Sequence, residues 1–124
     1  MLKAQTDVFM GCDSPFEAAG TVLFGAPFDS TTSNRPGARF GPNAIRRESY
    51  GLELYSPYQD LDLSDLAVLD TGDLELPMGS SLQAIAAIHD RAAEILSAGK
   101  RPFLLGGEHL VTLGAFQAAY ERYP

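Results

Sequence analysis

Residues 80–109 read SSLQAIAAIHDRAAEILSAGKRPFLLGGEH, and this stretch decides the fold class. Its first part places apolar residues at helical spacing, after a serine able to cap the helix and before a glycine suited to end it. Residues 102–105 form a short apolar run closed by two glycines, which is typical of a buried parallel strand. The stretch predicts a helix from Ser80 or Ser81 to Ala98, followed by a strand. The apolar stripe of this helix consists of Leu82, Ile85, Ile88, Ala92, Ile95 and Leu96.

The alternation of strand and helix continues on both sides of this stretch. Residues 21–25 and 66–70 are two further short apolar runs, and helices are expected from Pro42 to about Ser49 and soon after His109. This pattern is typical of an α/β fold, with a central parallel sheet between two helical layers. The expected final helix includes Leu113, Phe116 and Tyr120.

The remaining segments are expected to form loops. Residues 28–41 are rich in Ser, Thr, Asn, Gly and Pro and form a loop that is long for a strand-to-helix connection; such loops are commonly functional or disordered. Residues 71–73 should stop the second strand, residues 52–64 should be extended or form an edge hairpin, and residues 1–17 should form a terminal arm. No repeat or linker divides residues 1–124, so we expect one domain. Three short strands make a thin sheet, so we expect the domain to be incomplete, with its C-terminal remainder absent.

Composition and charge narrow the class of protein. The 124 residues are 45% hydrophobic and 20% charged, as in soluble globular proteins. A net charge of −7 repels phosphate backbones, so we expect no nucleic-acid partner. No apolar run approaches the roughly 20 residues of a membrane span and no secretory signal is recognisable, so we expect a cytoplasmic protein without membrane contact. Cys12 is the single cysteine, which excludes an intrachain disulfide and favours an idle thiol.

The motif GGEH at residues 106–109 directly follows the third expected strand. In open α/β sheets, ligands bind beyond the carboxyl ends of the strands. Paired glycines let the backbone turn sharply there, and a neutral imidazole at His109 is able to coordinate a divalent metal, with Glu108 as an outer-shell partner. Taken alone, the pattern also fits an ordinary loop histidine.

Other polar positions have two interpretations each. Arg35 and Arg39, held between glycines and prolines, either line the mouth of a site or pair with carboxylates, or they belong to a solvated turn that leads into a helix, which is favoured. Asp70 and Asp73 lie at a strand end as metal ligands often do, but capping of the turn or of the segment that follows is favoured. His89 falls within the long helix and is expected to have no metal role.

Several motifs, in order along the chain, resemble the ureohydrolase (arginase) family and its agmatinase branch. They are FGAPFD at residues 24–29, RPGARFGP at 35–42, IR at 45–46, DTGD at 70–73 and GGEH at 106–109. The segment YSPYQD at 55–60 resembles bacterial agmatinases more closely than arginases. The resemblance runs from about residue 20 to the end of the chain. It departs from the family's usual GGDHS motif at Glu108 and Leu110.

The resemblance implies an arginase-like fold and a centre of two Mn²⁺ ions. Its reaction would be the hydrolysis of agmatine to putrescine and urea, by metal-hydroxide attack on the guanidinium carbon. Only His109 matches a metal ligand of the family, and no catalytic residue is assigned. The family's two further aspartate motifs do not occur here, so the chain alone is expected to be inactive. The resemblance also implies Asn34, Arg35 and Gly37 as candidates for the substrate rim, and a homo-oligomer (trimer or hexamer) for the complete enzyme.

Three alternatives to an agmatinase are open. Another ureohydrolase, such as an arginase, guanidinobutyrase or formimidoylglutamase, would share the metal core but bind a different substrate tail. A non-catalytic assembly fragment is the second alternative, because one histidine cannot hold two metals. A nucleotide-binding α/β domain is disfavoured, since GGEH lacks the frame of a phosphate loop and Glu108 would repel phosphate.

Overall fold

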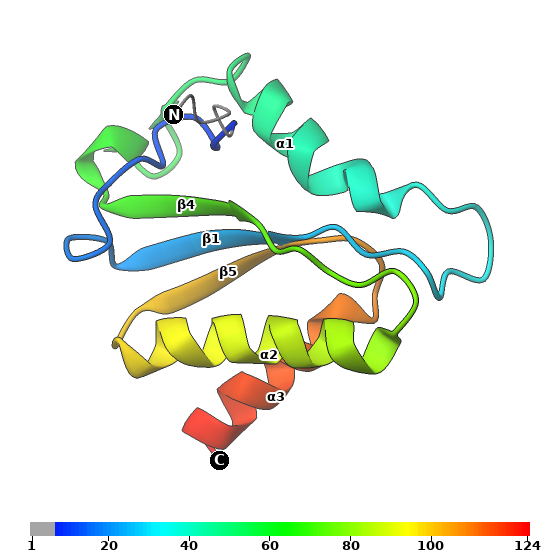
Figure 1. Ribbon diagram of the computed structural model, residues 1–124. Helices are drawn as coiled ribbons and strands as arrows, with labels where there is room; N and C mark the ends of the chain where they lie inside the picture. The colour runs from blue at the N-terminus through cyan, green and yellow to red at the C-terminus, as the bar shows by residue number, and fades with distance from the viewer. Residues whose placement is uncertain (1–6) are drawn as a thin grey trace, which may run out of the picture.

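Three parallel strands form the centre of the molecule. The computed structural model describes residues 7–124, so the first six residues of the expected arm lie outside the described part. β1 (Thr21–Ala26) lies between β4 (Val68–Asp73) and β5 (Arg101–Gly106). α1 (Gly41–Ser49) covers one face of the sheet, and α2 (Ser81–Ser97) and α3 (Val111–Arg122) cover the other (Figure 1). The expected α/β fold with a parallel sheet between helical layers is confirmed.

Short elements connect these layers. β2 (Tyr55–Ser56) and β3 (Leu61–Asp62) pair as an antiparallel hairpin, which is one of the two expected forms of this segment. Two 3-10 turns, η1 (Ala38–Phe40) and η2 (Leu63–Asp65), precede α1 and β4. None of the helices within residues 7–124 has the length and apolar character that crossing a membrane requires.

β4 is longer than expected. The turn predicted at residues 71–73 is part of the strand, because pairing with β1 continues past it. The register shifts after Leu23, so that Gly25 pairs with Asp73, and the Leu74 amide then donates to the Gly25 carbonyl at 2.8 Å. Pairing with a strand distant in sequence therefore overrides the local turn signal of Gly72.

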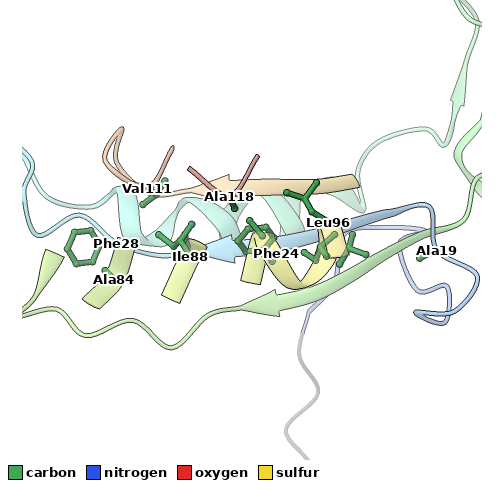
Figure 2. Close-up of a cluster of buried hydrophobic side chains, with 12 residues drawn as sticks. Ala19, Phe24, Phe28, Ala84, Ile88, Leu96, Val111 and Ala118 are labelled. Carbon is green, nitrogen blue, oxygen red and sulfur yellow. The ribbon is translucent and has the colours of Figure 1, made fainter. Parts of the chain in front are cut away.

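The main hydrophobic core lies between the sheet and the α2–α3 pair. Figure 2 shows Phe24 and Phe28 close to Ile88 of α2. Most of the expected α2 stripe is buried or half-buried, but Leu82 is 80% exposed, so the prediction was wrong there. At 100° per residue, Leu82 lies about 120° from Ile88 around the helix. Ala84, which the predicted stripe did not include, is buried in its place.

α3 packs against α2 through its small residues. The buried positions of α3 are Val111, Gly114 and Ala118, whereas Leu113, Phe116 and Tyr120 lie on its exposed side. A Cβ atom at Gly114 would lie 2.6 Å from the Ile85 carbonyl oxygen, so only glycine permits this approach of the two helices.

A smaller apolar cluster lies on the opposite face of the sheet. Its buried members are Cys12, Leu23, Val68 and Leu105. The Cys12 side chain is 2% exposed, and burial, together with the nearby Asp70 carboxylate, raises the pKa of its thiol to about 11. The thiol is therefore protonated at neutral pH, which makes it a poor nucleophile.

The two edges of the sheet differ. Asp13 bridges Leu69, and the Asp70 amide donates to the Cys12 carbonyl at 2.8 Å, so the preceding chain covers the outer edge of β4. No strand within residues 7–124 pairs with the outer edge of β5. A cavity of about 300 Å³, lined mainly by apolar side chains that include Leu23, Val68 and Phe103, lies on the face of the sheet that carries the smaller cluster.

Candidate functional site

An open crevice lies at the carboxyl end of β5. It has a volume of about 430 Å³ and is bounded by the loop after β1 and the turn after β5. The lining residues are Thr32, Ala38, Leu104, Gly106, Gly107, Glu108, His109, Val111 and Thr112. A neighbouring cavity of about 180 Å³ shares Glu108 and His109 with it. This is the end of the sheet at which open α/β folds bind their ligands.

Gly107, directly after β5, allows the turn that follows this strand to lie against the loop after β1. Gly107 has a φ of 57°, and a Cβ atom there would lie 2.4 Å from the Ala26 carbonyl oxygen and 2.8 Å from that of Phe28. The Gly107 amide donates to the Ala38 carbonyl at 3.4 Å. The turn after β5 is thus enclosed by both ends of the loop after β1, and only glycine fits at Gly107 without displacing that loop.

His109 is exposed and lines both cavities, as expected for a residue at a strand end. Within residues 7–124, no group of three or more His, Cys, Asp or Glu side chains is placed to hold a metal ion. One imidazole fills one coordination position, so these residues fit a single ligand and not a complete binuclear centre. The role of His109 as a metal ligand stays a prediction.

Glu108 points away from solvent, although the next residue is exposed. Its side chain is buried, and Oε1 accepts hydrogen bonds from the amide, at 3.2 Å, and the hydroxyl of Thr31. The Glu108 amide donates to the Phe28 carbonyl at 2.9 Å. This carboxylate therefore binds the loop after β1; its expected role as an outer-shell partner of a metal stays a prediction.

Asp29 organises the other end of the same loop, which the sequence did not predict. Its buried Oδ2 accepts hydrogen bonds from the Gly37 amide at 2.6 Å and from the Arg39 amide and Nε, each at 3.2 Å. Burial raises the pKa of Asp29, but the hydrogen bonds from Arg39 and Gly37 outweigh it and lower the pKa below its ordinary value. The only available signal was an acidic residue directly after an apolar run.

The predicted rim residues lie on this loop but not at the crevice wall. Asn34 and Arg35 are exposed and lie outside the lining of the 430 Å³ crevice, whereas Thr32 and Ala38 of the same loop are part of it. Gly37 is half-buried and donates its amide to Asp29. Arg39 pairs with the Asp29 carboxylate, so of its interpretations the structure supports pairing with a carboxylate.

Asp70 and Asp73 bind a buried arginine. Asp70 accepts from the Gly72 amide at 3.0 Å, in keeping with the favoured turn-capping role. Its main partner is Arg46 of α1, whose Nε and Nη2 reach the Asp70 carboxylate at 2.8 and 2.9 Å. Arg46 also donates to Asp73. The three side chains join α1 to the end of β4, a link that the sequence did not predict.

His89 bridges α2 and α3. Its Nε2 lies 2.9 Å from Glu121 and its Nδ1 lies 3.1 Å from Asp90. Hydrogen bonding to Glu121, and then to Asp90, raises the pKa of His89 above its ordinary value. Both ring nitrogens thus have carboxylate partners, and the absence of a metal role for His89 stays a prediction.

The stability supplied by His89 is expected to depend on pH. Because the folded-state pKa is raised, the contribution is fully present below the unfolded pKa of about 6.5 and is lost as pH rises through the folded-state value. The contribution is expected to be no more than about 1 kcal/mol, since the pair is partly exposed. Urea unfolding of wild type and His89→Gln at pH 5.5 and 8.5 measures it. A difference between the two proteins that grows with pH would contradict this assignment.

Known proteins match this arrangement of loops and strands. The sequence profile of the arginase family matches residues 19–124. Agmatinase from Bacillus subtilis (strain 168) is 46% identical over 117 residues, which cover 94% of this chain and 40% of that protein. The crystal structure of agmatine ureohydrolase of Thermoplasma volcanium matches with a TM-score of 0.85 and 32% identity, over 95% of this chain and 39% of that one. A Trypanosoma cruzi formiminoglutamase variant, solved with Mn²⁺, matches with a TM-score of 0.76 and 28% identity, over 87% and 37% of the two chains.

These matches confirm the arginase-like fold. They also show that the chain spans about 40% of the length of the relatives it matches. The matched region contains the three parallel strands, the interlocked loops at their carboxyl ends and the helix after His109. Because the family profile covers this whole region, the chain belongs to the arginase family.

Proposed function

We propose that this chain contributes the first metal ligand of a ureohydrolase that cleaves agmatine to putrescine and urea. The observation that carries the proposal is the exposed imidazole of His109, which lies in the GGEH motif at the carboxyl end of β5 and lines an open crevice. The relatives named agmatinase or agmatine ureohydrolase support agmatine as the substrate.

His109 would hold one coordination position of the centre through a neutral imidazole. Two bound Mn²⁺ ions would supply the chemistry by lowering the pKa of a water molecule toward neutrality. The chain's own contribution is a wall for the crevice, in which Thr32 and Ala38 face the turn that carries His109. Asn34, Arg35 and Gly37 remain candidates for the rim, at which the cationic substrate would enter.

The other ligands would come from sequence beyond these 124 residues. This fits the 40% share of the relatives' length that the chain spans. It also fits the outer edge of β5, with which no strand of residues 7–124 pairs, because an unpaired strand edge readily accepts another strand. The same edge favours a second candidate, a fragment that has no activity of its own and is stable only with a partner. A cytoplasmic location and a trimer or hexamer also stay predictions.

Mn²⁺ is expected to broaden the imidazole NMR signals of His109 and to leave those of His89 sharp. The chain has only these two histidines, so each spectrum contains its own control. Both ring nitrogens of His89 already have carboxylate partners on the α2–α3 surface, whereas His109 faces the crevice. A titration of the histidine-labelled chain with MnCl₂, with MgCl₂ as the diamagnetic control, measures the effect.

Binding should be weak, because a single side chain supplies the ligand, and His109→Ala should abolish the broadening. Equal broadening of both histidines, or none at His109, would reject the metal role.

The isolated chain should release no urea from agmatine, and measured turnover would contradict its dependence on further ligands. The complete protein should prefer agmatine to arginine and guanidinobutyrate. A preference for arginine or guanidinobutyrate would assign the protein to another branch of the same family.

A further inference from the structure

We infer that Glu108 is a positioning residue, whose carboxylate fixes the loop after β1 beside the crevice that His109 lines. The consequence for ligand binding rests on the proposed function of His109. The contact between Glu108 and the loop does not, because it consists of direct hydrogen bonds between two parts of this chain.

Consecutive residues of the GGEH motif point to different partners. His109 is exposed and borders both cavities, whereas Glu108 is 8% exposed and bonds to Thr31. The carboxylate accepts both hydrogen-bond donors of Thr31, the amide and the hydroxyl. With both donors directed to one oxygen, Glu108 holds Thr31 more firmly than a neutral acceptor would, since charge-assisted hydrogen bonds are roughly twice as strong.

The Glu108–Thr31 contact is the side-chain link between the two loops. The other links are backbone hydrogen bonds to Phe28 and Ala38, which hold the two ends of the loop. The Asp29 carboxylate holds the C-terminal part of the same loop by accepting a hydrogen bond from the Gly37 amide. The segment between Thr31 and Gly37, which carries the rim candidates, is thus held on one side by Glu108 and on the other by Asp29.

These contacts, all within the chain, tie the loop to the turn after β5. A loop that is already ordered loses less conformational entropy when a ligand contacts it. Glu108 therefore links the strand that carries His109 to the loop that faces it, and sets how closely residues 31–35 approach a cation held at His109. The carboxylate acts through Thr31 and has no contact with the substrate in this scheme.

Hydrogen exchange tests the contact itself. Glu108→Ala and Thr31→Val should each speed exchange of the amides at residues 31 and 32, which donate to Glu108 and to the Asp29 carbonyl, by about tenfold or more for Glu108→Ala. The double variant should exchange no faster than Glu108→Ala, because both changes remove one interaction. Thr31→Ser keeps the hydroxyl and should restore wild-type exchange. Glu94→Ala, which truncates an exposed glutamate on α2, is the matched control and should leave the loop unchanged. Unchanged exchange in both single variants would overturn the inference.

Mn²⁺ relaxation tests the positioning role. In the wild-type chain, Mn²⁺ should broaden the amides of residues 31–35 together with the His109 imidazole. In Thr31→Val the His109 signal should still broaden, whereas the effect on the loop amides should fall at least about twofold, since relaxation decreases steeply with distance. Broadening of the loop that is the same in both proteins would overturn the positioning role. If Mn²⁺ does not broaden the His109 signal, the metal-ligand role of His109 is rejected. The hydrogen-exchange result then decides by itself whether Glu108 holds Thr31.

Discussion

An Arg46→Met variant is expected to lose about 3–5 kcal/mol of unfolding free energy. The Arg46 side chain is fully buried, and its guanidinium binds two oxygens of Asp70, whose side chain is also fully buried, and one oxygen of Asp73. Methionine keeps much of the volume but removes the charge, so Asp70 becomes a buried carboxylate without a cation. Small domains are stable by only about 5–15 kcal/mol, so this loss is large. Urea unfolding followed by circular dichroism measures it.

Arg47→Met is the matched control for this experiment. Arg47 is the next residue of α1, its side chain is 74% exposed, and its carboxylate partner Asp7 is 4.0 Å away. Arg47→Met should therefore change the unfolding free energy by no more than about 0.5 kcal/mol. Adding Asp70→Asn to Arg46→Met should recover part of the loss, because the buried negative charge is then removed as well. If the Arg46 and Arg47 variants are equally stable, the buried ion pairs do not hold α1 against β4.

Gly107→Ala is expected to cost several kcal/mol of stability and to disorder the crevice. The positive φ of Gly107 alone costs a non-glycine residue about 1–2 kcal/mol. The added methyl group would also meet the carbonyl oxygens of Ala26 and Phe28, at 2.4 and 2.8 Å. Both atoms belong to the backbone of the interlocked loop, which must therefore move. Thermal unfolding measures the stability, and amide exchange of residues 28–38 measures the displacement of the loop.

Gly99→Ala separates the cost of the positive φ from the cost of the steric clash. Gly99 follows α2 with a φ of 73°, but no atom lies within 4 Å of the position its Cβ would take. It should therefore show only the conformational cost, of about 1 kcal/mol, with the crevice unchanged. Equal losses at both positions would mean that the loop after β1 yields to the methyl group, and that the two loops are less tightly interlocked than their contacts indicate.

Local sequence signals, such as caps and glycine stops, predicted an element well where contacts with distant segments do not change its ends. Ser80 caps α2 by accepting the Gln83 amide at 3.3 Å, and Gly99 ends that helix, both as the sequence indicated. The errors occur where a contact with a distant segment decides. β4 continues beyond its turn signal because β1 pairs with it, and Leu82 is exposed because the sheet lies beneath another side of α2.

The candidate site follows the same division. The position of His109 after a strand and a glycine pair was readable from the sequence, because motif and strand are adjacent in the chain. The partners of Glu108 and Arg46 were not, since Thr31 lies 77 residues from Glu108 and Asp70 lies 24 residues from Arg46. Nothing in the local pattern indicates that a charged side chain will be buried, because its desolvation is offset only by partners from other elements.

By itself, the sequence determined the α/β class, the order of strands and helices, and the placement of an imidazole directly after the third parallel strand. Hydrophobic periodicity, helix capping and glycine turns depend on only a few neighbouring residues, so these signals are the same however the elements pack together. The tertiary structure alone decided that β1 is the central strand, and that its loop encloses the turn before His109. It also decided that Glu108 and Arg46 turn inward to bind partners there. These features depend on which strands become neighbours, and that is set by the packing of the whole sheet against both helical layers.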